Sequence, residues 1–296
     1  GVNNMIFKDG DALLVTASYS QKGLGMILSA KRIDNMSFKS SRNEIGNALD
    51  INYLPPTTKQ HSYALPAIYP YATQPNGEMG LQAQLVYNIK KRTKLGGRYG
   101  TNVSINYSVV NSIDRTQIHD TIPIGTEGTL GYDSEFFKIG DEKYFQDFNI
   151  EVTKKFNKRL KGIFTYINLI YDMEIIEGHV GEDKVYANLG VVDLNYKFSH
   201  RKSLRLELQS LFTKQDDGDW FAALLEYSIA PKWFFTVMDM YNYGNDDPDK
   251  RFHYYNFAVA FIKKTNWISL SYGKQREGIL CVGGFCMHVP ASNGFT

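Results

Sequence analysis

The two cysteines of the chain, Cys281 and Cys286, stand close together in the segment CVGGFC. The two glycines between them allow the backbone to bring both sulfurs together, so in an oxidising compartment we expect a local disulfide. A reduced pair with a structural role is the alternative. His288 follows closely, but a disulfide is a simpler use of the two thiols than a metal site.

Other side chains that bind metals are scattered along the chain. The histidines fall in expected loops, turns or strand ends, and none forms a close pair: His61, His119, His179, His200, His253 and His288. The acidic segments at 216–219 (DDGD) and 246–249 (DDPD) lack the ligand spacing of a dedicated calcium loop, so solvated loop charge is the simpler interpretation. We therefore expect no metal and no cofactor.

No serine, histidine and acid stand in an arrangement typical of a hydrolase. His253 with strand serines such as Ser269 or Ser271 comes nearest, and it is a weak signal because serine is common in strands. The glycine-rich stretch LGGRYG at 95–100 is not followed by an expected helix, which argues for a tight connection and against phosphate binding. We expect that the chain is not an enzyme.

The sequence argues against two further classes of protein, those that bind nucleic acid and those that cross a membrane with helices. With 33 basic and 31 acidic residues the net charge is +2, and no basic stripe is present, so nucleic acid is not an expected partner. No apolar run approaches the ~18 residues that a membrane helix needs. The mean hydropathy of -0.33 does not exclude a β-barrel, because every second residue of a barrel strand faces a polar interior.

Alternation of polar and apolar residues marks most of the chain as β-strand. In the segment 204–213, for example, Leu204 and Leu206 oppose Arg205 and Glu207. Two segments, 160–175 and 233–242, are apolar or aromatic on both faces and cannot be oriented from the pattern. On the polar faces we expect the residues that line the interior: Gln82, Gln84, Asn102, Ser104, Asn106, Asp147, Asn149, Glu151, Asp193, Asn195, Arg205, Glu207 and Gln209.

The connections between these segments alternate strictly between very short and longer ones. Short joints at 21–23, 91–97, 157–158, 200–202, 231–232 and 264–266 alternate with links at 34–77, 111–142, 175–183, 215–218, 244–251 and 277–290. Brief periplasmic turns and larger outer loops are typical of a transmembrane β-barrel, and segments of about ten to sixteen residues are long enough to cross a bilayer. A large soluble β-sandwich or open sheet is the alternative.

The number of segments predicts an antiparallel all-β barrel of about 12 to 13 strands over residues 1–296, as one domain. Twelve segments are followed by 291–296, which is expected to begin a thirteenth. If the short turns are periplasmic, the first segment at 12–20 runs inward, so at least one strand should precede Gly1. We therefore expect the C-terminal part of a larger barrel in the outer membrane, in contact with its lipid.

Two stretches carry a family resemblance. Residues 52–107, beginning NYLPPTTKQHSYALPAIYPYATQPNGEMGLQAQLVYNIKKRTKLGGRYG, and residues 271–295, SYGKQREGILCVGGFCMHVPASNGF, resemble an uncharacterised family of outer-membrane β-barrel proteins from Bacteroidota. The resemblance implies the fold and the location, and members with a longer N-terminus agree with the strand count. It brings no activity and no catalytic residues.

The long link at 34–77 is rich in proline and tyrosine, which indicates an ordered loop. It contains five of the nine prolines, together with Tyr53, Tyr63, Tyr69 and Tyr71. Such a loop either folds into the interior as a constriction or covers the outer mouth for a partner. A surface loop without a role is the third possibility.

Two functions from different classes follow. The first is a porin-like channel or transporter whose polar interior has weak ion selectivity, because no ring of one charge dominates. The alternative is a non-catalytic structural or assembly subunit that binds other outer-membrane or surface proteins through its long aromatic loops. The sequence does not discriminate strongly between them, because charges such as Arg205 and Glu207 could line an open interior or pair across a closed one.

Overall fold

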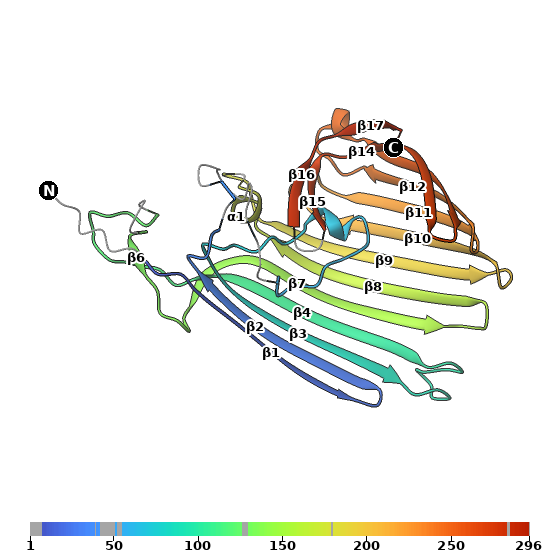
Figure 1. Cartoon of the computed structure of the whole chain (residues 1–296), viewed down its shortest axis with the longest axis horizontal. Helices are drawn as coiled ribbons and strands as arrows, with labels where there is room; N and C mark the ends of the chain where they lie inside the picture. Colours follow the sequence, from blue (N-terminus) through green and yellow to red (C-terminus); the bar gives the residue numbers. More distant parts are fainter. Residues whose placement is uncertain are drawn as a thin grey trace.

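A computed structural model describes residues 8–38, 40–41, 51, 55–125, 130–178, 180–282 and 285–295, with only the backbone described at 278–282 and 285–289. Most of these residues belong to one antiparallel sheet of 13 strands (Figure 1). Each strand pairs with the next strand of the sheet along the chain, so the order is that of a meander. The first and last strands are the two edges of the sheet.

The strands of this sheet are, in order, β1 (Asp11–Gln21), β2 (Leu24–Asp34), β3 (Gly77–Ile89), β4 (Thr101–Ile113), β7 (Ile139–Lys155), β8 (Leu160–Tyr171), β9 (Val185–Lys197), β10 (Lys202–Phe212), β11 (Trp220–Ile229), β12 (Trp233–Asn242), β13 (His253–Lys263), β14 (Asn266–Gln275) and β17 (Ser292–Phe295). The prediction of an all-β antiparallel fold is confirmed, as is the prediction of twelve long segments and the start of a thirteenth. Within the described residues β1 and β17 do not pair, so the sheet is open there.

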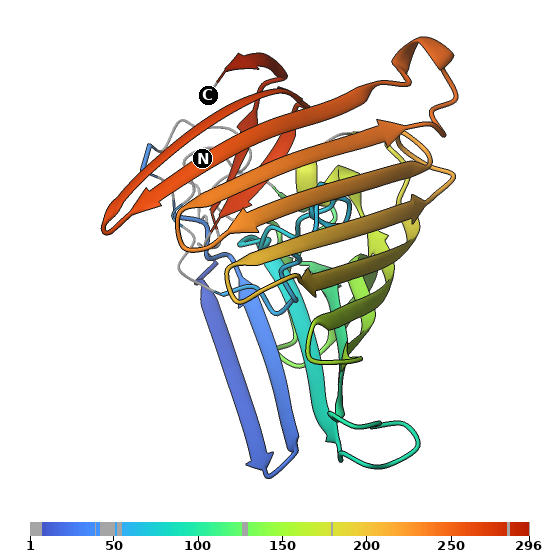
Figure 2. The same cartoon turned by 90° about the vertical axis from the view of Figure 1, so that its right-hand side faces the viewer.

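The sheet is strongly curved, so it has a concave and a convex face (Figures 1 and 2). Strand register sets which residues share a face, because side chains alternate along each strand. One row on the concave face joins Ser29, Gln82, Ser108 and Asp147, and a row on the convex face joins Leu225, Val237, Phe257 and Tyr272. The first row is polar and the second is apolar.

The smaller elements lie in the longer connections. They are η1 (Pro66–Ile68), β5 (Thr116–Gln117), β6 (Tyr132–Asp133), α1 (Met173–Glu177), η2 (Pro248–Lys250), β15 (Gly278–Val282) and β16 (Phe285–Val289). The β15–β16 hairpin within the 277–290 link has no counterpart among the expected strands. No helix of the described residues has both the length and the apolar character needed to cross a membrane.

One expected strand boundary is wrong. The apolar pattern extends the segment that begins at Leu160 to Ile175, whereas β8 ends at Tyr171 and α1 follows. The carboxylate of Asp172 accepts a hydrogen bond from the backbone N–H of Ile175, and Gly178 ends the helix in the left-handed conformation at φ 82°. These two capping residues favour one helical turn over continued strand.

Candidate functional site

The long loop after β2 lies against the concave face of the sheet (Figure 1), and residues 55–76 of it are here called the inner loop. Two of its basic residues, Lys59 and His61, contact β7. The imidazole Nε2 of His61 lies 2.6 Å from the Asp147 carboxylate, and the ammonium of Lys59 donates to Asn149 Oδ1 at 3.1 Å. Lys59 also lies 3.7 Å from a carboxylate oxygen of Glu151. The inner loop therefore places two basic side chains along the polar row of β7.

Further along, the inner loop meets a chain of polar groups on β9 and β10. The backbone N–H of Leu65 donates to Gln209 Oε1 at 2.9 Å, and the Gln209 amide donates to Glu207 at 2.6 Å. Arg205 forms ion pairs with Glu207 and with Asp193, the latter at 3.0 Å. One guanidinium thus faces two carboxylates, so this part of the interior has an excess of negative charge.

Tyr63 of the inner loop lies in the same electrostatic field. Burial, together with the carboxylates of Asp193, Glu151 and Glu207, raises the pKa of its phenol to about 12, against a smaller lowering effect of Arg205. Both effects disfavour a phenolate, because the charged form would be desolvated and would face like charges. The phenol therefore stays neutral well above the pH at which an exposed tyrosine ionises.

The end of the inner loop is fastened by a buried ion pair between β2 and β3. Lys31 and Glu78 lie 2.6 Å apart and neither side chain is exposed. Glu78 also accepts hydrogen bonds from the Tyr71 hydroxyl at 2.5 Å and from the backbone N–H of Gln74 at 2.6 Å. Lys31 donates to Thr73 Oγ1 at 3.3 Å. Both partners thus have further polar contacts, which help a buried ion pair to be tolerated.

Apolar side chains of the inner loop fill the interior beside these polar contacts. Tyr69 packs against Tyr171 with ring centroids 5.3 Å apart, and Tyr71 packs against Phe145 at 5.0 Å. Leu65 is fully buried in the same cluster, with Tyr171 and other core residues. Burial raises the pKa values of Tyr69 and Tyr71 well above the usual range, with Asp216 and Glu78 respectively adding to the effect. These packed side chains fill part of the space in front of the concave face.

A close backbone approach brings the start of the inner loop onto β3. A Cβ atom added to Gly80 would lie 2.1 Å from Thr57 Oγ1, so any larger residue at this position would displace the loop. Thr57 is itself buried. Glycine at position 80 therefore allows the loop to reach the wall.

The residues expected to line the interior lie on the concave face, where the structure brings many of them together. Gln82 donates to Asn106 at 2.9 Å, and Asn106 and Asn149 are fully buried. Asn195 stands opposite Arg205 in the strand register. Whether these residues line an open path stays a prediction. Of the loop tyrosines, Tyr63, Tyr69 and Tyr71 belong to the inner loop, and Tyr53 lies outside the described residues.

Sequence reasoning missed four residues that hold the loop: Lys31, Lys59, His61 and Glu78. Lys31 and Glu78 carried a usable signal, since each continues the polar face of its strand, in phase with Ser29 and with Gln82. Lys59 and His61 carried none. His61 and its partner Asp147 are 86 positions apart in the sequence, and nothing local relates them.

The remaining candidates are not assembled into a site. His253 contacts Asp239 at 2.7 Å, whereas Ser269 pairs with Ala260, seven residues along β13 from His253, or about 23 Å at strand spacing. Across the described part of the chain, no three His, Cys, Asp or Glu side chains are grouped as metal ligands. Cys281 and Cys286 face each other in the register of the β15–β16 hairpin. Their side chains lie outside the described residues, so the disulfide stays a prediction.

Comparison with known proteins adds a family. No curated protein matches the sequence. A solved structure described as "KdgM porin in complex with disordered oligogalacturonate" aligns with 78% of this chain and 82% of its own, at 11% identity and a TM-score of 0.25, which is too low to support a shared fold or function. The expected membership of an uncharacterised family is confirmed, and its restriction to Bacteroidota stays a prediction. A family profile matches residues 1–296, so the chain belongs to the family of unknown function DUF6029.

Proposed function

We propose that this chain forms the wall of a β-barrel in the bacterial outer membrane, and that the inner loop narrows a path for polar solutes through its interior. The observation that carries the proposal is the contact between the inner loop and the polar concave face. Basic groups of the loop lie against Asp147 and Glu151, and the loop backbone is bonded to Gln209. A loop held in this way inside a wall is a constriction.

The convex face supports the membrane location. The row Leu225, Val237 and Phe257 is between 44% and 49% exposed, and similar apolar residues continue along most strands. Soluble monomers rarely expose contiguous apolar patches of more than a few hundred Å², because such patches aggregate. Lipid is the natural covering for this face, and strands of about ten residues or more can span its hydrocarbon layer when tilted.

Closure of the barrel follows from the same location. An unpaired strand edge is not tolerated in lipid, because its backbone N–H and C=O groups have no partner there. In a meander, β1 and β17 are the first and the thirteenth strand and therefore run in the same direction. An all-antiparallel barrel then needs an odd number of further strands between these edges, whether they come from the same polypeptide or another.

The charges of the interior set the expected selectivity. Carboxylates at Asp147, Asp193 and Glu207 are accompanied by Arg205 and by Lys59 of the loop. Mixed charges imply weak discrimination between ions, with a modest preference for cations because acids are in excess. The proposal includes no catalytic role and no cofactor.

Single-channel recording in planar bilayers tests the proposal. Wild-type protein is compared with a variant that carries Lys59→Ala and His61→Ala, which removes the loop's polar contacts with β7 and retains its apolar anchors. We expect a small conductance from the wild type and a larger or noisier one from the variant. Folding of both is checked by the shift in electrophoretic migration on heating. Absence of conductance from both folded proteins would contradict the channel.

A structural or assembly role is the second candidate, and the cluster around Leu65, Tyr69 and Tyr171 favours it, because apolar packing can seal the interior. Under this alternative neither the wild type nor the variant conducts ions in the bilayer. A companion outer-membrane protein should then be retained in detergent at a constant ratio, and the retained ratio should not depend on Lys59 or His61.

A further inference from the structure

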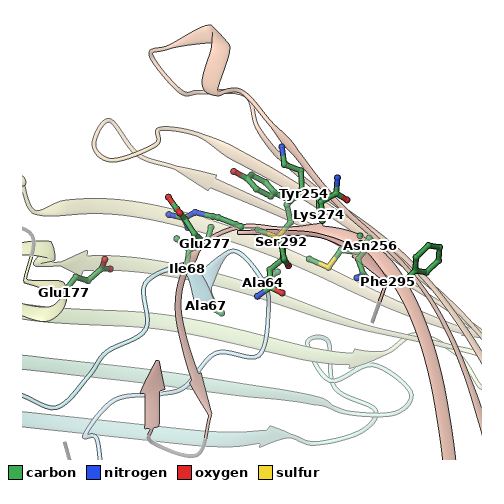
Figure 3. A pocket seen from close by; sticks show the side chains of 17 residues that line it. Ala64, Ala67, Ile68, Glu177, Tyr254, Asn256, Lys274, Glu277, Ser292 and Phe295 are labelled. Carbon is green, nitrogen blue, oxygen red and sulfur yellow. The ribbon is translucent and has the colours of Figure 1, made fainter. Parts of the chain in front are cut away.

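A pocket of about 520 Å³ lies between the inner loop and the last strands of the sheet (Figure 3). One wall is the short helix η1 with Ala64, Ala67 and Ile68. The opposite wall is built by β12, β13, β14 and β17. The volume lies in the range of sites for small organic molecules.

The pocket has an apolar part and a polar part. Met238 and Met240 of β12 line the pocket together with Ile68 of η1, and methionine adapts well to apolar ligands of different shapes. The polar part is formed by side chains of the final strands, including Asn256, Lys274 and Asn293. A ligand that fits both parts must therefore be amphipathic.

Lys274 is the cation available to such a ligand. Its ammonium lies 4.0 Å from the ring centroid of Phe252 and 5.2 Å from that of Tyr254, and it forms no ion pair with any described residue. Aromatic faces stabilise a cation without neutralising it. The half-buried Lys274 ammonium is therefore able to accept an anion as a partner.

The neighbouring charges do not compete for the same role. Arg276 lies 3.5 Å from a carboxylate oxygen of Asp217 and 5.5 Å from the Trp220 ring. Glu177 accepts a hydrogen bond from the Tyr171 hydroxyl at 2.9 Å and stands apart from Lys274 across the pocket (Figure 3). Glu277, which also lines the pocket, is exposed to solvent. Among the described residues that line the cavity, Lys274 is therefore the cation without an acidic partner, and there is room beside it for one acid group.

We infer that this pocket binds an organic monoanion, with its acid group on Lys274 and its apolar body between Ile68 and the methionines Met238 and Met240. The inference deepens the proposed channel, because it names a class of solute that would be held on the interior wall. Binding is measured at equilibrium, so it succeeds or fails independently of conductance.

Isothermal titration of the folded protein in a neutral detergent tests the inference with hexanoate and its uncharged analogue hexanamide. We expect hexanoate to bind more tightly than hexanamide. Lys274→Gln should weaken hexanoate binding about tenfold or more, because it removes a charge-assisted hydrogen bond, and should leave hexanamide unaffected. Ala67→Phe should abolish binding of both, since the exposed Ala67 faces the pocket and a larger side chain fills it.

The matched control is Lys263→Gln, which removes the same charge from the exposed far end of β13. It should bind hexanoate like the wild type. No binding of hexanoate to the wild type, equal binding of hexanamide, or unchanged binding to Lys274→Gln would overturn the inference. Conductance without hexanoate binding would contradict the proposed ligand but not the proposed channel. Hexanoate binding without conductance would contradict the channel but not the ligand.

Discussion

Leu225 provides a sharp test of the membrane location, because its convex-face side chain is 44% exposed near the middle of β11. If the convex face met water, Leu225→Arg would change the free energy of unfolding by less than about 0.5 kcal/mol, as surface substitutions usually do. If it meets lipid, an arginine near the bilayer midplane costs about 2–4 kcal/mol. That cost corresponds to a roughly 30- to 700-fold shift in the folding equilibrium.

The neighbouring residue Leu224 is the matched control. It lies on the concave face opposite Glu207 in the register with β10, so an arginine there can form an ion pair. We expect Leu224→Arg to cost much less than Leu225→Arg. The assay is urea-induced unfolding of protein refolded into lipid vesicles, followed by tryptophan fluorescence and by electrophoretic migration. Equal stability of the two variants in vesicles would refute the assignment of the convex face to lipid.

Three further predictions concern the inner loop. Glu78→Gln should lower the free energy of unfolding by about 3–5 kcal/mol, because it leaves the Lys31 ammonium buried without a counter-charge; urea unfolding in vesicles measures this, and a loss below about 1 kcal/mol would contradict it. Lys59→Glu should increase the permeability of cations relative to anions, because it adds an acid beside Glu151. Reversal potentials in a salt gradient measure the permeability ratio, and an unaltered ratio would place Lys59 away from the route of the ions. Subtracting the alkaline absorbance titration of Tyr63→Phe from that of the wild type should give a curve with its midpoint near pH 12. Because this folded-state pKa is raised, the phenol's contribution to stability is complete below pH 10 and is lost as the pH rises through 12. A midpoint near pH 10 would exclude the buried contact.

Much of the strand arrangement could be predicted from the sequence. Alternation over Leu204 to Thr213 fixes both the strand and its two faces, because the period of a strand is two. The order of strands in the sheet could also be predicted, since a short joint forces the two strands that it connects to pair. The end of β8 could not be placed by this reasoning, because Asp172 and Gly178 act through hydrogen-bond geometry that an apolar pattern hides.

The site itself was only partly predictable. The polar face was visible as a pattern, and the loop was visible as a concentration of tyrosine and proline, but their contact was not. Leu65 reaches Gln209 across 144 positions of sequence, and no rule of local spacing relates them. The position of the loop against the concave face therefore could not be predicted from the sequence.

The inner loop also has a mechanical consequence. It is bonded to Lys31 on β2, Asp147 on β7, Gln209 on β10 and Asp216 beyond β10, so a single segment ties together strands from opposite halves of the sheet. Any flattening of the sheet would stretch several of these bonds at once. The loop therefore works as a cross-brace that fixes the radius of the wall.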